Sequence, residues 1–298
     1  MKHNNVVPTI EEKMRCIPHV FYFNLDHETD RRYYMENQFN YYNIKHTRVS
    51  QTTYLVSEID KWINKVNNPT YPFELLDIDF LYHLGSLLTH IDLFKDWINN
   101  TNEDYLIIME DDYDLSLIEY WHFTWEYLMK RLPYDWDCLQ FSFETDREIS
   151  FFLHPRDWCD SGFGAMMLTR HYVKKILKIL HDSNGKVIVD NNIGMHKNAV
   201  AGNVIVPQVN HIPFSIDNCI GSTGVTYRLP LVTMNYLMHR DNKISDDYSC
   251  IHFFYCEQIV KKWWKQSRDN FSLNEFFTFG KANDHLMRVS VNPYNAMI

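Results

Sequence analysis

The sequence lacks three features that would each have indicated a class of protein, and it also contains little glycine. Its six cysteines include no C-x-x-C pair, which argues against a zinc module or a disulfide scaffold and predicts buried thiols in a reducing compartment. No run approaches the roughly 18 uncharged apolar residues of a membrane span. The formal net charge of -9 argues against nucleic-acid binding, because neutralising phosphates requires a basic surface. Glycine is scarce, at 9 of 298 residues, and this composition indicates no function by itself.

The chain does contain enough apolar material for a substantial core. Hydrophobic residues make up 45% of the sequence and aromatic residues 15%, which excludes disorder and suits one large domain or two modest ones. Residues 1–5 are polar apart from the initiating methionine, and no apolar run follows them. We therefore expect no signal peptide, no transmembrane segment and a cytoplasmic protein.

Strands and helices alternate along the first two thirds of the chain. Apolar and aromatic runs predict strands at 17–25, 46–49, 105–109, 137–143, 163–168, 187–189 and 204–206. Apolar residues at spacings of three and four predict helices at 27–42, 73–99, 117–131 and 171–181. This alternation predicts an α/β sheet flanked by helices.

The last third of the chain has a different pattern. Strand signals fade from about residue 210, and residues 249–266 predict an aromatic-rich helix. We expect a core at 1–209 and a largely helical extension at 210–298 packed on it. That extension could be an appendage or could wrap over the active site.

The most informative segment is the predicted strand 105–109, which runs directly into Glu110, Asp111 and Asp112. In open α/β sheets the carboxyl ends of the strands form the crevice where ligands bind. Three adjacent carboxylates repel one another unless a cation neutralises them, and hard divalent ions prefer carboxylate oxygen. The triplet therefore predicts a metal site for a phosphorylated ligand. The alternative is a solvated acidic turn or the first turn of a helix.

Several segments, in the right order, resemble glycosyltransferase family 25, which includes bacterial lipopolysaccharide glycosyltransferases and collagen galactosyltransferases. The opening strand and arginine-bearing turn (Val20 to Asp26, then Thr29 to Arg32) resemble the start of that family. Gly85 to His90 is similar to its G-x-x-x-S-H helix, with Thr89 in place of serine, and Tyr105 to Asp112 is similar to its strand ending in Glu-Asp-Asp. A weaker match is Gly162 to Arg170 with Asp190 beyond it. The likeness covers about residues 17 to 195 and nothing in 210–298.

The resemblance implies a GT-A-like, Rossmann-like sheet that binds a nucleotide sugar. It implies a transferase that moves a hexose, galactose or glucose, from a UDP-sugar with the help of Mn²⁺ or Mg²⁺. The implied acceptor is a hydroxyl on a glycan or on hydroxylysine of a collagen-like protein, and inversion of configuration is expected. A carboxylate-held divalent ion suits this chemistry because the leaving group carries two phosphates.

Strand alternation predicts that the three acidic side chains do not all point to the same side of the strand. On an extended strand end, Glu110 and Asp112 point to one side and Asp111 to the other. We assign Asp112 directly to the metal and Glu110 to the metal or the ribose. Asp111 belongs to the donor site mainly as the residue that anchors the loop.

Other donor-site candidates have structural alternatives. Arg31 or Arg32 could pair with the diphosphate or the nucleoside, or could be surface helix arginines. Asn24 and Asp26 could read the uracil or ribose, or could cap the next helix. His90 could line the donor site, although a lone histidine on a helix face that it shares with Leu87 and Phe94 is more often a satisfied structural group.

A third metal ligand and a catalytic base complete the predicted site. We favour His211 as the ligand, with His239 and His252 as the other candidates. Asp190 is the predicted base that takes the acceptor proton, with Asp160 and Asp217 in reserve. Asp190 could instead cap a helix that begins at residue 191.

Two rival functions follow from the same residues. One is a catalytically silent module that binds a glycan or a nucleotide sugar. The other is a metal-dependent phosphohydrolase with Asp26 as its nucleophile, although the sequence around Asp26 fits that role poorly.

Overall fold

A seven-stranded sheet forms the centre of the computed structural model, in the order β2-β1-β4-β9-β6-β11-β8. Its strands are β1 Val20–Asn24, β2 His46–Ser50, β4 Tyr105–Glu110, β6 Cys138–Gln140, β8 His154–Pro155, β9 Ala165–Thr169 and β11 Thr226–Arg228. The structure describes residues 7–51, 65–67, 78–142, 148–156, 163–188, 216–240, 248–267, 271–278 and 288–290.

The sheet is mostly parallel. β1 pairs in parallel with β2 and with β4, and β11 pairs in parallel with β6. β9 runs antiparallel between β4 and β6, and β8 is an antiparallel edge strand on β11. The predicted class, an α/β sheet flanked by helices, is confirmed at this level.

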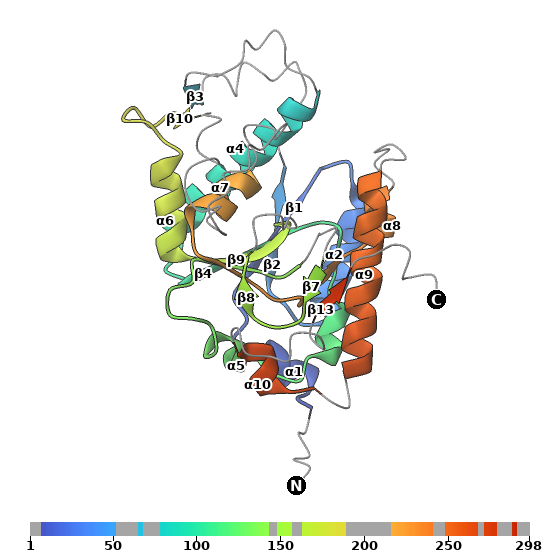
Figure 1. Ribbon diagram of the computed structural model, residues 1–298. Coiled ribbons are helices and arrows are strands. Elements are labelled where there is room, and N and C mark those ends of the chain that lie inside the picture. Colours follow the sequence, from blue (N-terminus) through green and yellow to red (C-terminus); the bar gives the residue numbers. More distant parts are fainter. Residues whose placement is uncertain are drawn as a thin grey trace.

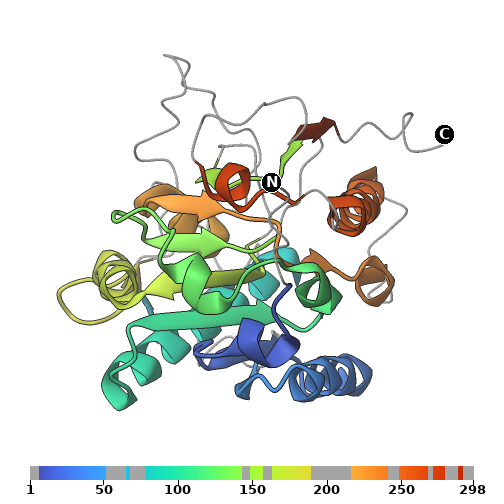
Figure 2. The same ribbon diagram turned by 90° about the horizontal axis from the view of Figure 1, so that it is seen from below.

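Helices cover both faces of the sheet (Figures 1 and 2). α4 (Ile78–Asn100), α6 (Arg170–Ile179) and α7 (Ile216–Thr223) pack against one another on one face. α2 (Thr29–Tyr41) and α9 (Tyr248–Ser267) lie on the other side, with α8 (Tyr236–Arg240) beside α9.

Side-chain alternation along β4 explains why the sheet is covered twice. Leu106 and Ile108 enter the core cluster formed with α4, α6 and α7, whereas Ile107 and Met109 enter the cluster formed with α2 and α9. All four side chains are buried. A strand that is apolar on both faces has to be covered on both faces, so it reads as a continuous apolar run.

Shorter elements fill the edges of the molecule. The helices are α1 Ile10–Met14, η3 Ser116–Tyr120, α5 Trp125–Met129 and α10 Leu273–Phe277. Three two-stranded sheets pair β10 (Val187–Ile188) with β3 (Val66–Asn67), β12 (Thr233–Met234) with β5 (Tyr113–Asp114), and β13 (Arg288–Ser290) with β7 (Glu148–Ser150). Within the described part of the chain, no helix is long and apolar enough to cross a membrane.

The predicted helix at 117–131 is wrong in one respect, because it is two short helices, η3 and α5, with a break between them. Trp121 has an extended backbone, and its indole N–H donates to the Leu231 carbonyl at 3.3 Å. Thr124 then caps α5 by accepting from the Tyr127 N–H. Burial of every second residue, Trp121, Phe123 and Trp125, overrides the helical period here.

The expectation that strands fade after about residue 210 is also wrong. β11 is an inner strand of the main sheet, so the sheet extends past the predicted boundary at 209. β11 is three residues long and contains a buried arginine, Arg228, so it gives almost no strand pattern. The predicted helix at 249–266 corresponds closely to α9. The strand predicted at 204–206 lies outside the described residues.

Candidate functional site

The carboxyl ends of β1 and β4 lie side by side. The two strands are parallel neighbours, with Phe23 opposite Glu110, so Asn24 and the acidic triplet follow at the same edge of the sheet. The chain leaves β1 toward β2 on one side and returns to β4 on the other side. Such a reversal of strand order is the topological switch point at which open α/β sheets bind ligands.

Asn24 joins the two strand ends. Its Nδ2 donates to Asp111 Oδ2 at 2.6 Å and to the Glu28 carbonyl at 2.9 Å. Its Oδ1 accepts from Arg32 Nε at 3.2 Å and from Arg48 at 3.1 Å. These four bonds use the whole hydrogen-bonding capacity of a carboxamide. Asn24 is only 1% exposed, so the structure gives it the contacts of a bridge between strand ends.

Arg31 connects α2 to the acidic turn. Its guanidinium donates to Asp111 Oδ1 at 2.9 Å and to the Met238 carbonyl at 2.7 Å, and it lies 3.9 Å from Asp112 Oδ2. Burial acts to lower the pKa of Arg31, but the charges of Asp111 and Asp112 outweigh burial and raise it. Arg31 therefore stays charged and holds the turn after β4 against α2 and α8.

Asp111 is held by two side chains, Arg31 and Asn24. Burial raises the pKa of its carboxyl, while Arg31 and Asn24 act in the opposite direction. A carboxylate held by an arginine and an amide inside the protein has the geometry of a loop anchor. Both carboxylate oxygens of Asp111 accept a hydrogen bond, Oδ1 from Arg31 and Oδ2 from Asn24.

Asp112 and Glu110 lie at the same edge. Asp112 is 3% exposed, and its backbone carbonyl accepts from the Asn235 N–H at 2.6 Å. Glu110 is half-buried, and its carboxylate lies against Gly164, where an added Cβ would be 2.8 Å from Oε2. The predicted alternation along the triplet does not hold, because β4 ends at Glu110 and the two aspartates form a turn. Both aspartates consequently approach Arg31.

A second group of polar residues forms a rim that is exposed at Asp26 and half-buried at Arg32 and Arg48. Asp26 accepts from Arg48 at 2.7 Å and from the Ser50 hydroxyl at 2.9 Å, and these bonds lower the pKa of its carboxyl. Arg32 donates to the Asp26 carbonyl at 2.9 Å. Arg48 was not predicted as a site residue. Its position near the carboxyl end of a predicted strand, at the same sheet edge as Asn24, was the available signal.

His90 is a buried residue of α4. Its Nδ1 donates to the Ser86 carbonyl at 2.8 Å, and its ring centroid lies 4.1 Å from that of Phe23. Burial lowers its pKa to about 4, so the ring is neutral at pH 7. His90 therefore packs against β1 at Phe23, the residue that precedes Asn24.

The predicted base Asp190 and the predicted metal ligand His211 lie outside the described residues, as does Asp160. Within the described ranges, no group of three or more His, Cys, Asp and Glu side chains is arranged to hold a metal ion. A Mg²⁺-type ion needs only one or two carboxylates when substrate phosphates supply other ligands. Asp112 and Glu110 fit that requirement by donor chemistry.

Comparisons with known proteins identify no family for this chain. No protein-family model matches it, and no curated protein matches it. Among solved structures, A197 from STIV is similar at 10% identity over 73% of this chain and 84% of that chain, with a TM-score of 0.38. A likeness at that level carries no argument about function.

Proposed function

We propose that the chain is a nucleotide-sugar-dependent hexosyltransferase of the GT-A type, with its donor diphosphate bound beside Asp112. One observation carries the proposal. Two neighbouring parallel strands end together at the switch point of the sheet, and a buried acidic turn is bridged there to Asn24 and Arg31. Burying a carboxylate is costly unless an opposite charge, hydrogen bonds or a metal ion compensates for the lost hydration. The family resemblance of the same segments supports this assignment.

The residues around the turn have two proposed roles, one structural and one in metal binding. Asn24 and Arg31 occupy Asp111 and so fix the course of the backbone after β4. Asp112 and Glu110 are the carboxylates that would hold Mn²⁺ or Mg²⁺. The bound ion would supply charge neutralisation for the departing nucleoside diphosphate. Arg32 and Arg48, half-buried at the rim beside Asp26, are the proposed contacts for the nucleoside or the sugar.

The donor sugar and the acceptor are narrower parts of the proposal. We propose galactose or glucose as the sugar, and a glycan or collagen-like hydroxyl as the acceptor, with inversion of configuration. Asp190 is the proposed base and His211 the proposed third ligand. These assignments rest on the resemblance and on residue type.

Titration calorimetry of UDP, with and without Mn²⁺, tests the donor site. We expect UDP to bind tightly only with the ion, and Asp112→Asn to weaken binding by at least tenfold. Asp104→Asn is the matched control, because Asp104 is an exposed aspartate just before the amino end of β4. It should bind UDP as the wild type does.

Product analysis with UDP-galactose and UDP-glucose then separates the rival functions. A transferase should hydrolyse the UDP-sugar slowly when water is the only acceptor, and it should release UDP faster when a sugar acceptor is present. Mn²⁺-dependent binding without turnover would instead identify a silent binding module. UMP and hexose 1-phosphate as the first products, from hydrolysis of the diphosphate bond, would identify a phosphohydrolase. A UDP affinity that changes neither on removal of Mn²⁺ nor in Asp112→Asn would refute the proposed donor site.

A further inference from the structure

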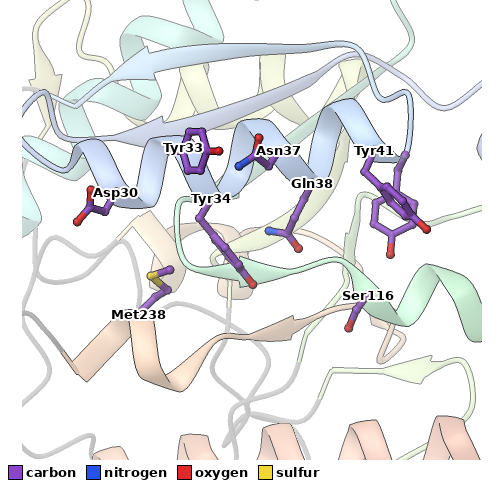
Figure 3. Close-up of a pocket in the computed structure, with 9 residues that line it drawn as sticks. Asp30, Tyr33, Tyr34, Asn37, Gln38, Tyr41, Ser116 and Met238 are labelled. Carbon is purple, nitrogen blue, oxygen red and sulfur yellow. The ribbon is translucent and has the colours of Figure 1, made fainter.

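A surface cavity of about 610 Å³ lies along α2, between that helix and two other elements, η3 with Ser116 and α8 with Met238 (Figure 3). Its volume is within the roughly 300–1,000 Å³ of small-molecule sites. Buried residues of α2, Met35 and Phe39, point into the core instead and take no part in the lining. The cavity therefore uses a different face of α2 from the one that packs on the sheet.

Tyrosine dominates the lining. Tyr33 and Tyr41 are 71% and 69% exposed, although they are among the largest side chains of the helix. Tyr34 and Tyr42 line the same cavity, and the ring of Tyr42 meets that of Tyr41 edge to face at a centroid distance of 4.8 Å. An exposed aromatic ring on its own requires no explanation. Two exposed rings that line one cavity give it aromatic surface that a ligand could cover.

Planar polar groups accompany the rings. Asn37 is exposed and lies four residues from both Tyr33 and Tyr41, so the three side chains occupy successive turns of one face. Asp30 is exposed at the start of the helix. Gln38 is committed to the protein, because its amide donates to the Tyr113 carbonyl and accepts from the Leu115 N–H. Gln38 thus holds one wall of the cavity in place, while the exposed side chains of Asn37 and Asp30 are accessible to a ligand.

We propose that this cavity binds a neutral oligosaccharide. The exposed rings of Tyr33 and Tyr41 offer flat apolar faces to the C–H side of a pyranose, and their phenol hydroxyls remain in water. Tyr34 belongs to the wall, because its hydroxyl accepts from Asn235 Nδ2 at 3.0 Å. Asn37 and Asp30 supply a donor and acceptors for sugar hydroxyls. Tyr33 and Tyr41 are about 12 Å apart along the helix axis, which suits two rings of one chain that are not adjacent.

The lining chemistry separates this ligand from other classes. Among the described lining residues the charged side chain is Asp30, an anion that would repel phosphate. The nucleotide donor proposed above is therefore not its ligand. The oligosaccharide proposal does not depend on transferase activity.

Saturation-transfer NMR and titration with a neutral glucan pentasaccharide and a neutral galactan pentasaccharide test the proposal. We expect at least one to bind at millimolar concentration. Tyr33→Ala and Tyr41→Ala should each weaken binding by roughly 2- to 10-fold, the range for loss of one aromatic contact. Tyr33→Phe should keep most of the affinity, because it keeps the ring. Tyr134→Ala is the matched control, since Tyr134 is 101% exposed and does not line the cavity.

Folding should not confuse the result, because Tyr33 and Tyr41 are mostly exposed and thermal unfolding can be compared directly. Binding of neither pentasaccharide would overturn the proposal. So would binding that is unchanged when both tyrosines are replaced by alanine. A change in oligomeric state of these variants by light scattering, without any oligosaccharide binding, would show that the face joins two copies of the chain instead.

Discussion

Replacing Arg31 by methionine should be among the most destabilising single changes near the acidic turn. The substitution keeps much of the aliphatic stem but removes a bond of 2.9 Å to Asp111 and a bond of 2.7 Å to the Met238 carbonyl. Hydrogen bonds to charged groups contribute about 1.5–3 kcal/mol each. Breaking a buried ion pair costs about 3–5 kcal/mol, because the remaining charge stays buried. We expect the free energy of unfolding to fall by about 3–5 kcal/mol at pH 7.

The pH dependence gives this prediction a sign. Burial already raises the pKa of Asp111 above its unfolded value, and loss of Arg31 removes an opposing effect, so the pKa should rise further. A carboxyl whose folded pKa is raised stabilises the fold at low pH and loses that contribution as pH rises through the folded pKa. The gap between Arg31→Met and wild type should therefore narrow as pH falls toward the unfolded pKa of about 3.9.

Urea unfolding at several pH values measures both effects. Adding Asp111→Asn to Arg31→Met should recover about 2 kcal/mol or more, because the buried charge is gone. Arg131→Met is the control; Arg131 lies over the ring of Tyr127 at 4.9 Å, and its loss should cost about 1 kcal/mol or less. A cost below about 1 kcal/mol for Arg31→Met, or no recovery in the double variant, would refute the reasoning.

Two further outcomes are expected. The pKa of His90 is lowered to about 4, so its contribution to the free energy of unfolding is complete above the unfolded pKa of about 6.5 and is lost as pH falls from 6.5 to 4. His90→Gln should remove this pH dependence, which amounts to up to about 3 kcal/mol. An unchanged pH profile would contradict this. Gly164→Ala should cost about 1–3 kcal/mol and weaken Mn²⁺-dependent UDP binding, because a Cβ there meets Glu110 and Tyr113 at 2.8 Å. Gly185→Ala is the control, because φ is +77° there and a Cβ added at that position would have no described atom within 4 Å. It should reduce stability through backbone strain but leave UDP binding unchanged. UDP binding unaffected by Gly164→Ala would remove Glu110 from the donor site.

Local periodicity was sufficient to predict several elements of the fold. The apolar run of β4 and the spacings of α4 and α9 led to elements close to those observed. The signal is local in each case, since a strand covered on both faces and a long packed helix each have a characteristic period. The acidic triplet at the end of β4 could be placed at a sheet edge for the same reason.

The sequence by itself therefore determined which segments form the sheet edge and which acids lie there. Only the tertiary structure decided what those residues touch. Arg31 bonds to Met238, 207 positions away, and Asn24 bonds to Asp111, 87 positions away. β11 enters the sheet although its three residues carry no period that could be recognised. Contacts between distant segments depend on how the chain returns to the sheet, and a local pattern contains no information about that return.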